Sequence, residues 1–297
     1  MLSRRSFVLA AGSGIVAGSF VARSVYANHH LKLPLGIQLY TVREETNKDV
    51  EGTLRKLYAL GFREIEFAGY YGKTPADLLA LMKSIGFTLV STHTDATNIS
   101  NKGAQIIAEA KALGLKHIIC SSPLAKGDKN KLGYGEKMDA LDLTDWKANA
   151  ELFNKFGAEV KAAGLTFGYH NHHVEFKKFD GKSGFDALFE WSDPALVKVQ
   201  LDVGWAVAAG EDPVAILNKY KDRVISLHVK DIGKLADDPH KAQTVAVGEG
   251  KVDWKTVLAT AHKNGVKHYF YEQEPPHQRP ILESAKISAD YLAKISF

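Results

Sequence analysis

One local pattern occurs four times in this chain and constrains its fold more than any other feature. Each copy has the end of a helical segment, then a glycine, an apolar residue, a polar residue and an apolar run. The copies are Ala-Leu-Gly-Phe-Arg, Ser-Ile-Gly-Phe-Thr, Ala-Leu-Gly-Leu-Lys and Ala-Ala-Gly-Leu-Thr, at residues 59–63, 84–88, 112–116 and 162–166. Glycine at such a position is typical of a helix C-terminus. The chain is therefore expected to alternate between helices and strands.

Eight apolar runs fit the strands of this alternation, and a helical segment follows each of them. We expect strands at 35–40, 64–68, 88–93, 116–121, 165–173, 197–203, 224–230 and 267–272, and helices at 50–60, 75–85, 103–113, 144–163, 183–190, 213–219, 254–264 and 281–295. This pattern predicts an α/β protein, a (β/α)8 TIM barrel in a single domain. The alternative is a doubly wound open sheet, but residues 40–43 after the first strand form no glycine-rich phosphate turn.

Two polar segments are longer than the usual connections of such a fold. Residues 126–142 and 233–250 are expected to be loops, and the first is a candidate lid over the barrel mouth.

The first 27 residues resemble an export signal. Arg4 and Arg5 precede a short apolar run rich in glycine and alanine, and Val25-Tyr26-Ala27 fits the rule for signal cleavage. We expect a twin-arginine signal peptide at 1–27, recognition by the twin-arginine export machinery, and a periplasmic barrel at 28–297. The alternative, a membrane anchor, would need a run of about 20 apolar residues.

The charge and cysteine content exclude some classes of function. The leader contains three arginines and no acidic residue, so cleavage lowers the formal charge from +4 to about +1. Such a balance indicates neither a nucleic-acid partner nor an anionic membrane. Cys120 is the only cysteine, so no intramolecular disulfide can form, and its apolar surroundings predict a buried thiol. No stable membrane anchor is expected after the leader, and the oligomeric state is not predicted.

Histidines gather where the fifth expected strand ends. Residues 165–173 read Leu-Thr-Phe-Gly-Tyr-His-Asn-His-His. Side chains alternate along a strand, so His170 and His172 are expected on one face. Histidine is the commonest metal ligand and the usual acid–base group near neutral pH. A solvated, histidine-rich turn is the alternative.

Most of the other strands also finish in polar side chains, and in a TIM barrel these ends meet at one mouth. The ends carry Gln38, Tyr40, Glu66, His93, Ser121, His170, His172, Asp202, His228, Lys230, Glu272 and Glu274. We expect the two histidines and two carboxylates on four successive strands to bind one metal ion: His170, Asp202, His228 and Glu272. Mixed imidazole and carboxylate ligands suit Mn²⁺, Zn²⁺, Co²⁺ or Fe²⁺ better than Mg²⁺.

Each remaining polar residue has a structural alternative. His93 could be a hydrogen-bonded core histidine, Glu66 could pair with a basic side chain, and Glu175 could lie on a solvated loop. Tyr40 and Trp205 could be packing residues, although aromatic walls also suit sugar rings. Lys230 has no partner evident in the sequence and is a candidate for binding a substrate oxygen.

Four motifs resemble one known family. They are Gly-Tyr-His-Asn-His-His-Val-Glu-Phe at 168–176, Gln-Leu-Asp-Val-Gly-Trp at 200–205, Ser-Leu-His-Val-Lys-Asp at 226–231 and Tyr-Glu-Gln-Glu at 271–274. Together they are similar to the xylose-isomerase-like barrels, the sugar phosphate isomerase/epimerase group, which shares its barrel with endonuclease IV. The resemblance implies one divalent metal held by residues of strands five to eight, with Asp202, His228 and Glu272 as matching ligands.

The resemblance has one departure that bears on the reaction. The ketose epimerases have a glutamate at the end of strand five and move protons with two glutamates, on opposite faces of the sugar. The matching place here holds His170, so His172 or Glu175 would have to act as the base. The inosose dehydratases of the same group carry out elimination instead. A nuclease would need several metals and a basic face.

The function expected from the sequence is a metal-dependent isomerase or epimerase that converts a sugar or keto-sugar through an enediolate. A lyase or dehydratase acting on a keto-sugar, keto-glycoside or inosose is the alternative, and a non-catalytic periplasmic sugar-binding protein is the alternative of another class. The expected catalytic residues are Glu272, Lys230, His172 and Glu175. The expected substrate-binding residues are Gln38, Tyr40, Glu66, His93, Trp205 and Lys230.

Overall fold

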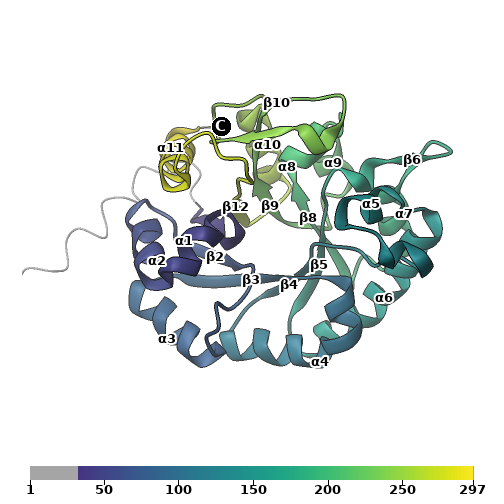
Figure 1. The fold of residues 1–297 in the computed structure, drawn as a ribbon, viewed down its shortest axis with the longest axis horizontal. Helices are drawn as coiled ribbons and strands as arrows, with labels where there is room; N and C mark the ends of the chain where they lie inside the picture. The colour runs from purple at the N-terminus through teal and green to yellow at the C-terminus, as the bar shows by residue number, and fades with distance from the viewer. Residues whose placement is uncertain (1–32, 297) are drawn as a thin grey trace, which may run out of the picture.

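The computed structural model describes residues 33–296, so the predicted signal peptide at 1–27 lies outside the described residues. Eight parallel strands close into a barrel in the order β1-β12-β9-β8-β5-β4-β3-β2 (Figure 1). These strands are β1 Leu35–Gln38, β2 Glu64–Phe67, β3 Thr88–Thr94, β4 His117–Cys120, β5 Thr166–His170, β8 Val197–Asp202, β9 Val224–Val229 and β12 His268–Tyr271. The predicted TIM barrel is confirmed, and the open sheet is excluded.

A ring of helices covers the outside of the barrel (Figure 1). The main helices are α2 Val50–Ala59, α3 Pro75–Ile85, α4 Ala96–Leu113, α6 Leu143–Ala162, α7 Gly184–Trp191, α9 Pro213–Lys219, α10 Trp254–Lys263 and α11 Ile281–Lys294. The glycines of the four repeated motifs all have positive φ angles, between 69° and 105°. This backbone conformation is the one that favours glycine at a helix end, so the repeated pattern did mark helix termini. None of the helices between residues 33 and 296 has the length and apolar character needed to span a bilayer.

Several predicted boundaries were wrong. Helix α4 begins at Ala96 rather than at residue 103, because Asp95 caps its N-terminus and accepts a hydrogen bond from the Asn98 amide. Strand β1 stops at Gln38, because the chain turns there into the 3-10 helix η1 at Leu39–Val42. Short helices that were not predicted follow β1 and β8, namely α1 Arg43–Lys48 and α8 Val203–Ala208.

Both segments predicted as irregular loops contain secondary structure. The first holds the 3-10 helix η2 at Gly127–Lys131 and helix α5 at Tyr134–Asp139. The second forms the antiparallel pair β10 Asp231–Lys234 and β11 Gln243–Val245, with the 3-10 helix η4 at Pro239–Lys241 between them. A further 3-10 helix, η3 at Val174–Phe176, and the short hairpin of β6 Lys178–Phe179 and β7 Lys182–Ser183 follow β5.

Apolar side chains fill the space between barrel and helices. Phe153 and Phe156 of α6 pack their rings against Phe167 of β5, with centroid distances of 5.5 and 5.2 Å. Cys120 is fully buried, and burial raises the pKa of its thiol, which agrees with the predicted inert cysteine.

The carboxylate of Asp231 holds the β10–β11 segment to the barrel. It accepts hydrogen bonds from the backbone amides of Ile232, Gly248, Gly250 and Val252, and from the indole Nε1 of Trp254. The side chain is buried, so removing it would leave these donors without partners in a place that water does not reach.

We therefore expect Asp231→Ala to lower the free energy of unfolding by about 3 kcal/mol and the melting temperature by roughly 5–10 °C. Chemical denaturation and calorimetry would measure both. Asp222→Ala is the matched control, because Asp222 is an exposed aspartate. A melting temperature for Asp231→Ala within 1 °C or so of that control would contradict this role for the carboxylate.

Candidate metal centre and active site

Four ionisable side chains from neighbouring strand ends converge at the mouth of the barrel. They come from the ends of β5, β8 and β9 and from the residue after β12, and one ligand atom of each lies within 4.8 Å of those of the others. These residues are His170, Asp202, His228 and Glu272, the set expected from the sequence. The strand register explains part of the convergence, because Asp202 and His228 are direct neighbours across β8 and β9.

Asp202 directs one carboxylate oxygen toward the two histidines of the cluster. Its Oδ1 accepts a hydrogen bond from the Trp205 amide at 2.8 Å. Its Oδ2 is buried, and the ammonium of Lys230 lies 2.8 Å from it. The same oxygen faces His170 Nε2 at 3.8 Å and His228 Nδ1 at 3.9 Å. A buried carboxylate oxygen aimed at two imidazole nitrogens is the donor arrangement of a transition-metal site.

His170 is held in a state suited to metal binding. Its Nδ1 lies 3.1 Å from Gln200 Oε1, an atom that can only accept, so Nδ1 carries the proton and Nε2 keeps a lone pair. Burial lowers the pKa of His170 well below its ordinary value, and the neighbouring imidazoles of His228 and His172 lower it further. The neutral ring therefore presents Nε2 to the cluster.

His228 is held by a carboxylate on each side. Its Nε2 lies 2.5 Å from Glu66 Oε1, and its Nδ1 lies 2.7 Å from Glu272 Oε2. Burial acts to lower the pKa of His228, but Glu272 and Glu66 together raise it to about 10. A carboxylate on the far nitrogen is the usual support of a metal-binding histidine, so Glu66 orients the ring while Nδ1 faces the cluster.

Glu66 is the centre of a polar layer inside the barrel. Its carboxylate accepts hydrogen bonds from Gln38 Nε2, Ser91 Oγ and Gln200 Nε2 at 2.6 to 2.9 Å, and from His93 Nε2 at 3.1 Å. Burial acts to raise the pKa of Glu66, but His93 and His228 hold it well below its ordinary value. Glu66 and Gln38, both predicted to bind substrate, are fully buried and support the site from below.

Lys230, for which the sequence shows no partner, has three carboxylate partners. Its buried ammonium lies 2.8 Å from Asp202 Oδ2, 3.0 Å from Glu272 Oε2 and 2.5 Å from Glu274 Oε1. Burial acts to lower the pKa of Lys230, but these carboxylates hold it well above its ordinary value. Lysine is therefore a fixed positive charge next to the cluster.

The charge balance favours a divalent cation. The carboxylates that meet here outnumber the cationic groups, and a divalent metal ion in place of the proton on His228 Nδ1 would reduce the excess of negative charge. The carboxylates are Glu66, Asp202, Glu272 and Glu274, and the cationic groups are Lys230 and His228. Two imidazole nitrogens and two carboxylate oxygens thus make a site that could bind one metal ion.

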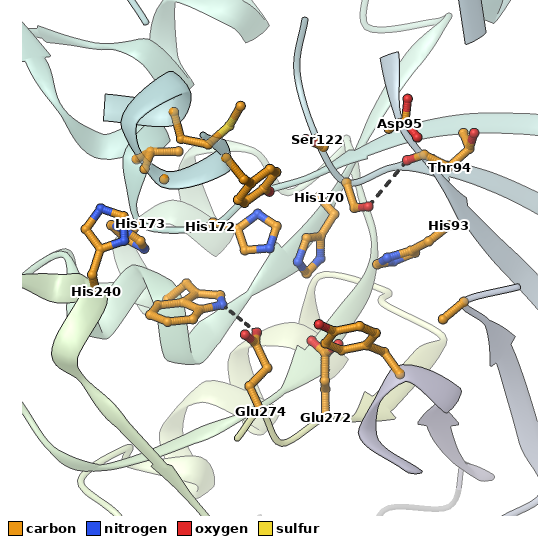
Figure 2. Close-up of a pocket in the computed structure, with 18 of the residues that line it drawn as sticks. His93, Thr94, Asp95, Ser122, His170, His172, His173, His240, Glu272 and Glu274 are labelled. Atoms are coloured by element: carbon orange, nitrogen blue, oxygen red, sulfur yellow. Dashed lines mark hydrogen bonds between the residues drawn. The ribbon is translucent and has the colours of Figure 1, made fainter. Parts of the chain in front are cut away.

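A cavity of about 680 Å³ opens above this cluster. Figure 2 shows the imidazoles of His93, His170 and His172 and the carboxylates of Glu272 and Glu274 around it. Of the residues predicted from the sequence, six line the cavity, namely Tyr40, His93, His170, His172, Trp205 and Glu272. Six others do not: Gln38, Glu66, Glu175, Asp202, His228 and Lys230.

Glu175 lies behind the cavity wall rather than on a solvated loop. Its carboxylate accepts hydrogen bonds from Tyr169 Oη at 2.6 Å and from the backbone amide of His172 at 2.8 Å. It therefore holds the turn that carries the histidines after β5. Burial raises the pKa of Glu175 to about 7, and the hydrogen bonds from Tyr169 and His172 oppose that rise only in part.

Some residues of the site were not among those to which the sequence analysis assigned a role. Gln200 lies two positions before Asp202 on β8, so strand alternation could have placed both on one face. Glu274 accepts hydrogen bonds from Trp205 Nε1 and Lys230, although it lies beyond the end of β12. His173 and His240 line the outer part of the cavity, with ring centroids 4.1 Å apart (Figure 2). No local pattern in the sequence pairs two loops that are so far apart.

The fold and this strand-end site define a class of barrel enzymes, and a sequence comparison identifies the family. The family model of the xylose isomerase-like TIM barrel matches residues 54–295, and the chain belongs to this family. The resemblance seen in the four motifs is thereby confirmed.

The curated relatives include several inosose dehydratases. Those of Clostridium perfringens and Lacticaseibacillus casei are 29% and 26% identical over 161 and 192 residues, which cover 49% and 59% of this chain. The chain spans 54% and 63% of the length of these two relatives. The inosose dehydratase of Geobacillus thermodenitrificans is 27% identical over 256 residues, or 75% of this chain and 85% of the relative.

Solved structures with the same fold carry several names. A sugar phosphate isomerase/epimerase of Parabacteroides distasonis has a TM-score of 0.70 and 24% identity over 88% of this chain and 94% of its own. An L-ribulose 3-epimerase has a TM-score of 0.63 and 16% identity, over 88% and 94%. An IOLI protein with a bound zinc atom has a TM-score of 0.66 and 13% identity, over 88% and 98%. At such identities these likenesses show the fold alone.

The raised pKa of Glu175 gives a prediction about pH and stability. Its folded-state pKa of about 7 lies above the ordinary 4.5, so between these values the folded protein binds more protons than the unfolded chain. Stability is then lost as the pH rises through this window, by as much as about 3 kcal/mol. Glu175→Gln should remove this contribution, so its unfolding free energy relative to the parent protein should increase from pH 5 to pH 8.

Denaturant titrations at four or five pH values would measure the change. Glu151→Gln, at an exposed glutamate of α6, is the control and should show a constant difference from the parent protein. A constant difference for Glu175→Gln as well would mean that Glu175 is ionised throughout this range.

Proposed function

We propose that this protein is a metal-dependent enzyme that removes a carbon-bound proton next to the carbonyl of a sugar-like substrate, and that the product forms by elimination. The observation that carries the proposal is the cluster His170, Asp202, His228 and Glu272 at the floor of a cavity. The metal ion, of the Mn²⁺, Zn²⁺, Co²⁺ or Fe²⁺ type, would polarise the carbonyl and stabilise negative charge on substrate oxygens.

His172 is our choice for the group that moves the proton. It lines the cavity, its ring centroid lies 5.0 Å from that of His170, and burial lowers its pKa to about 4 although Glu274 opposes that shift. A neutral imidazole can take the carbon-bound proton as a base. The ammonium of Lys230, with Glu272 and Glu274 beside it, adds positive charge close to the oxygens on which negative charge develops.

The fate of the proton separates the two reactions. In an elimination, the proton on His172 goes to the departing hydroxyl, the carbon–oxygen bond breaks, and water leaves. In an isomerisation or epimerisation, the same proton, or another, is delivered to carbon. Elimination is favoured here because β5 ends in His170 instead of a second carboxylate base, and because the curated relatives include inosose dehydratases. A sugar-binding protein without activity would have no need for the metal cluster.

Three variants test the proposed roles. His170→Ala and His228→Ala should each lower metal affinity by more than about 100-fold, because each removes a ligand and not merely its support. Lys230→Met should keep the metal. The variant removes a positive charge beside Asp202, Glu272 and Glu274, so these carboxylates attract a metal cation at least as strongly as before. It should lower the exchange of substrate protons by about 100-fold or more, because a charge-stabilising donor is missing.

Metal analysis of the purified proteins and proton exchange of keto-sugars and keto-glycosides in deuterated water would measure these effects. Lys234→Met, at an exposed lysine of β10, is the control for the lysine change. Full metal content and full exchange in His170→Ala would sink the proposed centre. A metal-loaded protein that exchanges no substrate proton would favour the sugar-binding alternative.

We also propose that the protein is exported to the periplasm through the twin-arginine pathway. The support is Arg4-Arg5 with the apolar run and cleavage motif that follow, and a metal enzyme folded before export suits this route. Replacing both arginines by lysine should leave the precursor in the cytoplasm, whereas Arg23→Lys should have no effect. Cell fractionation and mass measurement of the N-terminus would test this, and normal processing of the double variant would contradict it.

A further inference from the structure

We infer that the cavity binds an uncharged glycoside with two ring-sized units, the first over the metal cluster and the second in the outer part of the cavity. This inference rests on the proposed function for the reacting end of the substrate, and it adds the substrate class.

The charge of the cavity disfavours a phosphorylated sugar. The described residues that line it include no lysine or arginine. Their ionisable side chains are tyrosines, histidines, one aspartate and two glutamates. Lys230 lies below and already contacts three carboxylates. Arg43 does not line the cavity, and its guanidinium lies 4.2 Å from the ring centroid of Tyr40 and donates to the Tyr40 carbonyl oxygen. A phosphate dianion would therefore meet Asp95, Glu272 and Glu274 without a dedicated cation.

The size of the cavity exceeds the needs of one sugar ring. A hexose has about a dozen non-hydrogen atoms, and even at the roughly 30 Å³ that one water occupies in the liquid it takes up no more than about 360 Å³. The cavity measures about 680 Å³, which leaves room for a second unit of similar size.

The cavity is also long, and rings follow one another along it. From one end of the cavity to the other these are His93, His170, His172, Trp205, His173 and His240, with neighbouring centroids 4.1 to 6.2 Å apart. In Figure 2, His93 lies at one end of the cavity, and His173 and His240 lie at the other. Ring faces of this kind pack well against the C–H faces of sugars.

The outer part has features that a second ring would satisfy. Both ring nitrogens of His173 are buried and have no hydrogen-bond partner among the described residues, yet the side chain lines the cavity. Two sugar hydroxyls could satisfy this ring, one by donating to the unprotonated nitrogen and one by accepting from the N–H. Tyr134 lines the same cavity although its side chain is largely exposed, and Met138 beside it adds apolar surface.

Exposed apolar side chains gather at this end of the barrel. The large hydrophobic residues that are exposed in the described part of the chain are Tyr40, Leu132, Tyr134 and Leu235. All four lie in segments that follow the C-terminal ends of β1, β4 and β9, where the cavity opens. Such a concentration at one mouth is typical of a surface that receives a ligand.

Calorimetric titration of the purified protein with a set of unreactive sugars tests the inference. The probes are maltose, cellobiose and trehalose as neutral disaccharides, methyl α- and β-glucoside as single rings, and glucose 6-phosphate. We expect the best disaccharide to bind at least about tenfold more tightly than the best single ring, and glucose 6-phosphate to bind more weakly than either.

His173→Phe keeps the ring but removes its hydrogen-bonding nitrogens, and should lower disaccharide affinity several-fold more than the affinity for a single ring. His262→Phe is the matched control, since His262 is an exposed histidine of α10 that does not line the cavity. Equal affinity for one and two rings, tightest binding of the phosphate, or no binding of any probe would each overturn the inference.

The outcome is separable from that of the proposed function. Disaccharide preference without proton exchange of keto-glycosides would leave the substrate class standing and refute the reaction. Proton exchange with single keto-sugars, together with no preference for two rings, would do the reverse.

Discussion

The constraint on which this structure depends is the burial of several carboxylates next to two cationic side chains. Asp202, Glu66, His228 and Lys230 are all completely buried. Removing such groups from water costs several kcal/mol each unless partners and hydrogen bonds offset the loss. The register of the parallel strands supplies those partners, since Asp202 lies beside His228 and Glu66 lies beside both Gln38 and Ser91. A one-residue slip of any of these strands would turn its polar side chain to the apolar outer layer.

The polar layer also explains how hydrogen bonds between protein side chains hold the site in place. Gln200 fixes His170 and His93 through its oxygen and Glu66 and Ser226 through its nitrogen. One amide therefore sets the ring orientation of two histidines and the position of the carboxylate that orients His228. Glu66 and His93 each have a further partner, so these side chains have little rotational freedom left, which is what a preorganised centre requires.

The sequence predicted the barrel and the convergence of the cluster because both follow from periodic patterns. Apolar runs and terminal glycines recur through the chain, and strand ends in such a fold meet at one mouth. The ion pairs of Lys230 were missed although its three carboxylate partners were all placed at the same mouth, because a position at a strand end does not tell which side chains touch. The burial of Glu175 was missed because it depends on two contacts beyond the strand pattern, with Tyr169 Oη and with the His172 amide. The elements at 126–142 and 233–250 were missed because short helices and hairpins have too few residues for a clear period.

The inner part of the site and its outer wall are built from different kinds of structure. The inner residues come from strand ends, and their positions are set by the barrel. The outer wall comes from α5, η3 and the β10–β11 segment. Asp139 at the end of α5 contacts both of the others: its Oδ1 lies 2.9 Å from His240 Nε2, and its carbonyl oxygen accepts a hydrogen bond from Lys177 Nζ at 2.7 Å. These contacts are partly exposed, so each contributes only a modest free energy. The outer wall can therefore change its sequence, and with it the second unit that it receives, while the buried charges at the strand ends keep the same arrangement.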